Sequence, residues 1–169
     1  MMRGFLRFSP LALLVGACAK EAPPTPPSLE QTGRVVDSAN ILDADFETEL
    51  TNRLARLEDE TKVQLVVATT TDLERTPIAD YSVKLARDWG IGSKSRNDGL
   101  LVLVAPNERQ VRIEVGYGLE ASVKDEEAAR IINKAMVPQF EHSDYEAGIS
   151  DGVDRLIDEV TPHTMKEAA

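Results

Sequence analysis

The chain has 169 residues, of which 28% are charged, and its formal net charge at pH 7 is −10. An acidic surface repels the phosphate backbone of nucleic acids, and no basic cluster offsets this repulsion, so we expect no nucleic-acid-binding function. Two histidines and a single cysteine are too few for a zinc site or for covalent catalysis that depends on a histidine.

Residues 1–17 have the features of a secretory signal. Arg3 and Arg7 precede an apolar stretch, which ends in small residues before Cys18. The stretch is much shorter than the roughly 20 residues of a membrane-spanning helix. Removal of the signal leaves a chain of net charge −12, because Arg3 and Arg7 are lost.

The sequence around Cys18 resembles a bacterial lipobox. This resemblance predicts cleavage before Cys18 and acylation of that residue, with palmitate as one acyl chain. Several acyl chains on one residue would hold the domain to a membrane durably. The mature protein would then be a lipoprotein of the cell envelope on the extracytoplasmic side, which is the periplasmic side in a Gram-negative cell. A plain signal peptide with a chance cysteine is the alternative.

We expect one folded domain after a short spacer. Residues 18–32 contain a proline-rich run at positions 22–28, which lacks backbone donors and favours extended polyproline geometry. The remaining chain is long enough for one domain, predicted at residues 33–162, with a tail at residues 163–169. Without a second cysteine, the domain must be stabilised by its core alone.

Hydrophobic periodicity predicts alternating helices and strands. The predicted helices are residues 43–61, with Asp43 as N-cap; residues 76–89, with Thr76 as N-cap and Gly90 as the end; residues 125–136, ending before Pro138; and residues 144–160. The predicted strands are residues 63–69, 100–105 and 110–116. A right-handed crossover makes the first two strands parallel, and a turn at residues 106–109 makes the third antiparallel. These elements predict a three-layer α/β domain with a small mixed sheet.

Carboxylates at predicted strand and loop positions are the main candidates for a site. They are Asp37, Asp72, Asp98, Glu114, Glu120 and Asp125. Such oxygens bind hard cations, although each residue is alternatively a helix cap or a turn residue. Arg112 and Glu114 lie two residues apart on a strand and share a face. If that face is covered, their charges must be compensated or serve a ligand; if it is exposed, they protect an edge strand from aggregation.

Glycines mark two turns near these residues. Gly116 and Gly118 are compatible with an anion-binding nest of backbone N–H groups. A strand end that needs positive φ is the favoured explanation. In the Asn97-Asp98-Gly99 turn, we expect Gly99 to supply the unusual dihedral.

Six segments in this order resemble the TPM domain family, which includes a thylakoid lumen phosphatase. They are residues 36–42, 89–92 (Trp-Gly-Ile-Gly), 97–99, 112–120 (Arg-Ile-Glu-Val-Gly-Tyr-Gly-Leu-Glu), 138–140 and 144–149. The resemblance implies a Rossmann-like α/β/α sandwich, usually extracytoplasmic and membrane-tethered, which binds divalent cations. For some members it also implies acid phosphatase activity.

Two functions follow from these observations. The first is a lipid-tethered accessory or interaction module, which binds Ca²⁺ or Mg²⁺ and meets a protein partner in the cell envelope. The alternative is a metal-assisted acid phosphatase, because an acidic chain repels phosphomonoesters unless a cation inverts the local field. In the enzyme, Asp37, Asp98 and Glu114 would hold the cation, Arg112 or Lys94 would steady the phosphate, and bound water would attack, with Asp98 and Arg112 as catalytic residues. A pocket that gathers the three carboxylates favours the enzyme, whereas a flat exposed apolar patch without a concave acidic pocket favours the module.

Overall fold

The computed structural model describes the backbone of residues 29–167 and the side chains of residues 29–161. The predicted signal at residues 1–17, the acylated Cys18 and most of the proline-rich spacer lie outside this range, so the lipid anchor stays a prediction. Within the described range, no helix combines the length and the hydropathy needed to cross a membrane.

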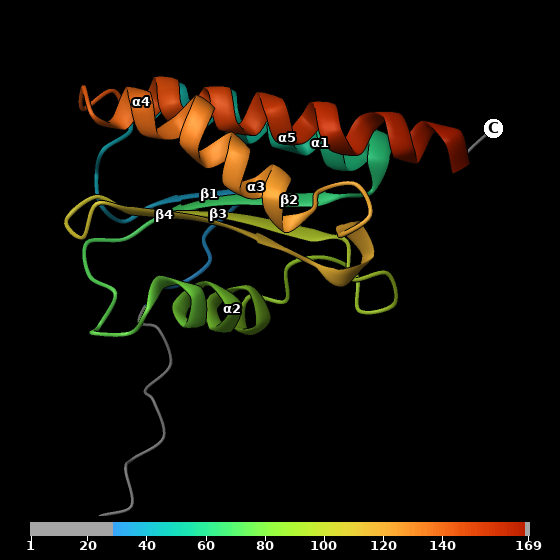
Figure 1. Cartoon of the computed structure of the whole chain (residues 1–169), viewed down its shortest axis with the longest axis horizontal. Helices are drawn as coiled ribbons and strands as arrows, with labels where there is room; N and C mark the ends of the chain where they lie inside the picture. Colours follow the sequence, from blue (N-terminus) through green and yellow to red (C-terminus); the bar gives the residue numbers. More distant parts are fainter. Residues whose placement is uncertain (1–28, 168–169) are drawn as a thin grey trace, which may run out of the picture.

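A four-stranded sheet lies between two helical layers (Figure 1). Its strands are β1 (Val35–Asp37), β2 (Gln64–Thr69), β3 (Gly99–Ala105) and β4 (Gln110–Val115), in that spatial order. The first three are parallel, and β4 is antiparallel to β3. The structure thus confirms the three-layer α/β/α sandwich with a small mixed sheet, and it adds the short strand β1, which the sequence did not predict.

The helices divide unequally between the two faces of the sheet. Helix α2 (Ile78–Asp88) covers one face alone, while α1 (Ala44–Thr61), α3 (Asp125–Ile131) and α5 (Tyr145–Glu167) cover the other (Figure 1). Each of the parallel strands β1, β2 and β3 lies beside the one before it, so the chain crosses the sheet in one direction. The helices that connect them, α1 and α2, lie on opposite faces of the sheet. The two crossovers therefore have opposite hands, and one of them is the rare left-handed form.

Two apolar cores explain why β3 is apolar along its whole length. Leu100, Val102 and Val104 pack towards α1 and α5, whereas Leu101 and Leu103 pack towards Tyr81 and other residues of α2. Successive side chains of a strand point to opposite faces, so a strand covered on both faces must be apolar at every position. All seven residues of β3 are buried.

The helix starts differ slightly from the prediction. Asp43 precedes α1 at the N-cap position, but its side chain makes no capping hydrogen bond. Helix α2 begins at Ile78 with Pro77 at the N-cap position, so the prediction of Thr76 as N-cap was wrong by one residue.

The predicted helix end before Pro138 was also wrong. A π-helical turn at Ile132–Met136 follows α3 and leads directly into α4 (Val137–Phe140). Pro138 directly follows the π-helical turn and occupies one of the first two positions of α4, where prolines are tolerated. At the other end of the chain, α5 continues to Glu167, so residues 163–167 of the predicted tail are helical.

Candidate functional site

Three of the six segments that resemble the TPM family meet at the amino end of β3. Residues 97–98 lead into β3, residues 89–92 follow α2, and residues 116–118 follow β4. The N–H of Gly116 donates to the carbonyl oxygen of Gly99 at 2.8 Å, and the N–H of Gly118 donates to that of Asn97 at 3.0 Å. These bonds tie the end of β4 to the loop before β3.

Gly99, Gly116 and Gly118 serve close backbone contact, not positive φ. Gly99, Gly116 and Gly118 have no positive φ, whereas Asn97 has a φ of 52° and Gly92 one of 86°. The expectation that Gly99 and the 116–118 turn supply positive φ was therefore wrong. A Cβ atom on Gly99, Gly116 or Gly118 would overlap the carbonyl oxygen of a neighbouring segment. Glycine is required there because two backbones touch.

A pocket of about 410 Å³ lies between α2 and β4. Its walls are Val83, Ala86 and Arg87 of α2, residues 90–94 of the following loop, and residues 112–116 of β4 and its end. Tyr117 also lines the pocket and is 76% exposed, which makes it the exposed large hydrophobic side chain of the described residues. The motif therefore builds a concave surface with an aromatic residue at its rim.

Arg112 and Glu114 lie on the α2 face and line this pocket. Glu114 Oε2 accepts a hydrogen bond from Ser82 Oγ at 3.1 Å and one from Arg112 Nε at 3.1 Å. Ser82 is fully buried on α2, while the Glu114 and Arg112 side chains are 20% and 40% exposed. The face is thus partly covered, and the carboxylate is compensated by its neighbours, as a half-buried charge requires.

Asp98 is used inside its own loop. It is 6% exposed, and its Oδ1 accepts a hydrogen bond from the Ser93 N–H at 2.7 Å, while Oδ2 pairs with Arg96 Nε. A carboxylate that satisfies a backbone donor and an arginine stabilises a turn. Asp98 therefore fixes the loop that forms one end of the pocket.

Asp37 lies at the opposite end of the sheet. It is in register with Thr69, which is in register with Val104 of β3, whereas Asp98 precedes β3. The levels of Asp98 and Val104 are six residues apart, which is about 20 Å at the rise of a strand. Asp37 accepts hydrogen bonds from Thr69 Oγ1 at 2.5 Å and the Leu42 N–H at 2.9 Å. Asp37, Asp98 and Glu114 do not meet, and cation binding stays a prediction.

A cluster of polar side chains surrounds Tyr81 at the carboxyl ends of β2 and β3. Tyr81 is 3% exposed. Burial is the main cause that raises the pKa of its phenol; a hydrogen bond with Thr70 lowers the pKa, and the nearby carboxylates Glu74, Asp72 and Glu108 raise it. Tyr81 therefore stays neutral beyond the pH at which an exposed tyrosine ionises.

Sequence reasoning missed two residues of the site: Arg87, which lines the pocket, and Ser82, which donates to Glu114. Ser82 was detectable as a polar residue beside Tyr81 and Leu85 on the buried face of α2. Arg87 lies in the last turn of α2, where a cation is ordinarily explained by the helix dipole.

Comparisons with known proteins show the family and the fold of the chain. The model of the TPM domain matches residues 35–159. No curated protein matches the chain. The N-terminal domain of a protein from P. gingivalis, solved by NMR, is 34% identical, with a TM-score of 0.73 over 79% of this chain and 85% of that one.

Two more distant NMR structures share the fold. The BA42 protein of Bizionia argentinensis is 19% identical, with a TM-score of 0.64 over 73% of this chain and 83% of that one. The N-terminal domain of the cg2496 protein of Corynebacterium glutamicum is 16% identical, with a TM-score of 0.58 over 86% and 85%. The family match covers most of the described residues and contains every segment of the pocket. The chain belongs to the TPM domain family.

Proposed function

We propose that the protein is a lipid-tethered, extracytoplasmic binding module of the cell envelope, and that the pocket between α2 and β4 is its binding surface. The observation that carries this proposal is the pocket of about 410 Å³ with Tyr117, 76% exposed, at its rim. Aromatic residues at the edge of a concave surface are enriched where proteins bind partners.

The end of the spacer lies on the same side of the sheet as the pocket. The Trp89 indole N–H donates to the carbonyl oxygen of Leu29 at 3.1 Å, and Leu29 packs against the core under α2. The spacer from Cys18 to residue 28 would span at most about 35 Å in extended polyproline geometry. An anchor at Cys18 would therefore keep the pocket close to the membrane, where it could contact a partner protein of the envelope.

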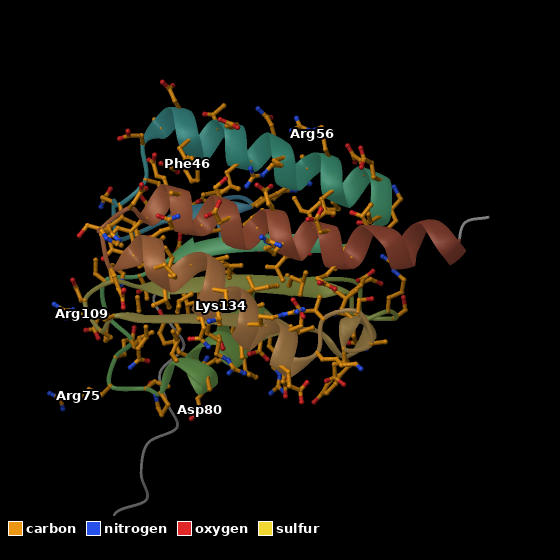
Figure 2. All side chains as sticks on the ribbon, turned by 45° about the horizontal axis from the view of Figure 1, so that its top comes forward. Phe46, Arg56, Arg75, Asp80, Arg109 and Lys134 are labelled. Atoms are coloured by element: carbon orange, nitrogen blue, oxygen red, sulfur yellow. The ribbon has the colours of Figure 1, made fainter. Side chains whose placement is uncertain are left out.

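Partner binding is tested by photocrosslinking in intact cells. A photoreactive amino acid replaces Tyr117 in one variant and Arg56, exposed on α1 (Figure 2), in the control. We expect a discrete crosslinked protein from position 117 and none from position 56. Equal crosslinking from both positions, or none from either, would contradict a binding module.

The anchor is tested by Cys18→Ser. We expect this variant to appear as soluble or unprocessed protein instead of lipid-labelled mature protein in the membrane fraction. Mature, lipid-labelled Cys18→Ser protein would show that Cys18 is not the anchor.

Binding of Ca²⁺ or Mg²⁺ is the second part of the proposal. The family resemblance supports it. A cation that binds only the folded state raises the melting temperature. We expect millimolar Ca²⁺ or Mg²⁺ to raise it and a chelator to reverse the shift; an unchanged melting curve would contradict cation binding.

A metal-assisted phosphatase is the second candidate function. It is favoured by one observation, that Lys94 and Arg112 line the same pocket as Glu114. Hydrolysis of a generic phosphomonoester by the chain without residues 1–27, with and without chelator, tests it. Asp98→Asn affects the loop as well as any chemistry, so Glu114→Gln is the clearer variant. Activity that neither chelator nor Glu114→Gln lowers would contradict this mechanism.

A further inference from the structure

Strand β4 is the last strand of the sheet, so one of its edges has no partner strand. The N–H of Gly116 donates to the carbonyl oxygen of Gly99, which makes these two residues a hydrogen-bonded pair. Such pairs alternate along an antiparallel ladder, so Glu114 also directs its backbone groups at β3. The N–H and C=O groups of Ile113 and Val115 consequently point outward, as donors and acceptors for another strand.

The strand that carries this free edge lines the pocket. Ile113 lines the pocket, although it is only 4% exposed and its side chain packs in the core on the other face of the sheet. What Ile113 presents to the pocket is therefore its backbone. The same holds for Val115, whose side chain packs against the same core. Figure 1 shows β4 as the outermost strand, with α2 on one side of it and α3 on the other.

We propose that an extended peptide segment of a partner protein adds to β4 in this groove, with acidic side chains at alternate positions. Strand addition gains affinity from main-chain hydrogen bonds and specificity from the surroundings of every second side chain. The inference rests on the proposed binding module and specifies the class of its partner.

The charges of the groove select the acidic side chains. Alternate side chains of an added strand would point to the α2 face, where Arg87, Lys94 and Arg112 line the pocket. Glu114 lies on the same face, but its carboxylate is already hydrogen-bonded to Ser82 and Arg112. Arg87 and Lys94 are exposed and form no ion pair with the described side chains. Arg112 binds Glu114 through Nε, which leaves both terminal nitrogens available to a ligand.

The intervening side chains of the segment are selected differently. They would point to the α3 face, where Asp125 lies at the pocket. Asp125 and Glu120, which also lines the pocket, carry the opposite charge. A uniformly acidic segment would be repelled there, so we expect polar or basic residues between the acidic ones. Tyr117, at the end of the groove, is placed to pack against the segment.

The test uses the mature chain carrying Cys18→Ser and a synthetic heptapeptide, acetyl-Thr-Glu-Thr-Glu-Thr-Glu-Thr-amide. On titration we expect NMR shifts of the Ile113, Val115 and Gly116 amides, and slower hydrogen exchange at Ile113 and Val115. The same peptide with lysine in place of each glutamate should bind at least tenfold more weakly. The double variant Arg87→Glu/Lys94→Glu should bind the glutamate peptide at least tenfold more weakly than the parent chain does. Arg56→Glu, on the far helical layer (Figure 2), should bind it with the affinity of the parent chain.

Several results would overturn the inference. The first is equal binding of the two peptides, or no binding of either. The second is an equal loss of affinity in Arg56→Glu and in the double variant. The third is a dimer in sedimentation whose β4 amides are already protected without peptide, because a second copy would then occupy the edge. Crosslinking through position 117 that survives Arg87→Glu/Lys94→Glu would leave the binding module standing and refute this inference alone.

Discussion

Replacement of Gly116 by alanine tests whether backbone contact holds the pocket together. An added Cβ would lie 3.0 Å from the carbonyl carbon of Asn97 and 3.0 Å from the carbonyl oxygen of Gly99, and closer still to the Asn97 oxygen. All of these atoms are backbone, so the strand and the loop must separate. Overpacking of this kind costs roughly 1–3 kcal/mol, and we expect the free energy of unfolding to fall by about 2 kcal/mol.

Urea denaturation of the mature chain gives this free energy, and Gly33→Ala is the matched control. A Cβ on Gly33 meets its nearest backbone atoms at 3.7 and 4.0 Å, and its φ is not positive. Gly33→Ala should leave stability unchanged or raise it by up to about 1 kcal/mol, because alanine restricts the unfolded chain. If Gly116→Ala proves as stable as Gly33→Ala, close backbone contact is not the reason for glycine at position 116.

Three further variants test the core, the loop and the buried phenol. Leu54→Ala should lower the free energy of unfolding by about 2–5 kcal/mol in urea, because Leu54 is fully buried; a loss below about 1 kcal/mol would contradict its core position. Asp98→Asn should cost about 1–3 kcal/mol, because the amide cannot accept from both Ser93 and Arg96; an unchanged urea midpoint would refute the role of Asp98 in the loop. Burial raises the pKa of Tyr81, so the unfolded chain loses this proton first and stability should fall above about pH 10. Tyr81→Phe should reduce that fall in alkaline urea titrations, and an identical slope would refute the raised pKa.

The sheet was largely predictable because the pattern of apolar residues along its strands has one physical explanation. A strand that is apolar at every position must be covered on both faces, and a helix between two such strands makes them parallel. Pro138 shows the limit of such reasoning, because a proline ends a helix or occupies its first turn, and the preceding π turn is not encoded by a recognisable pattern.

The candidate site was predictable only in part. The shared face of Arg112 and Glu114 follows from strand periodicity and is confirmed by their common hydrogen-bonded position. The separation of Asp37 from Asp98 follows from topology, since one residue ends a parallel strand and the other precedes one. Ser82 was not predictable as a partner of Glu114, because the contact depends on how α2 packs across β4.

The glycines show why local sequence does not decide local conformation. A glycine after a strand is equally consistent with positive φ and with close approach of another backbone. At Gly116 the second explanation holds, because the loop before β3 passes directly beside it. In the preceding turn, Asn97 and not Gly99 adopts the left-handed conformation.

Hydrogen–deuterium exchange of the mature chain mixed with envelope membranes tests the central claim most directly, which is that the free edge of β4 binds the partner. Membranes from cells that lack this protein supply the partner, and the chain alone is the reference. We predict slower exchange at residues 110–116 and unchanged exchange on α1. Equal protection of both segments, or protection of α1 alone, would contradict binding at β4.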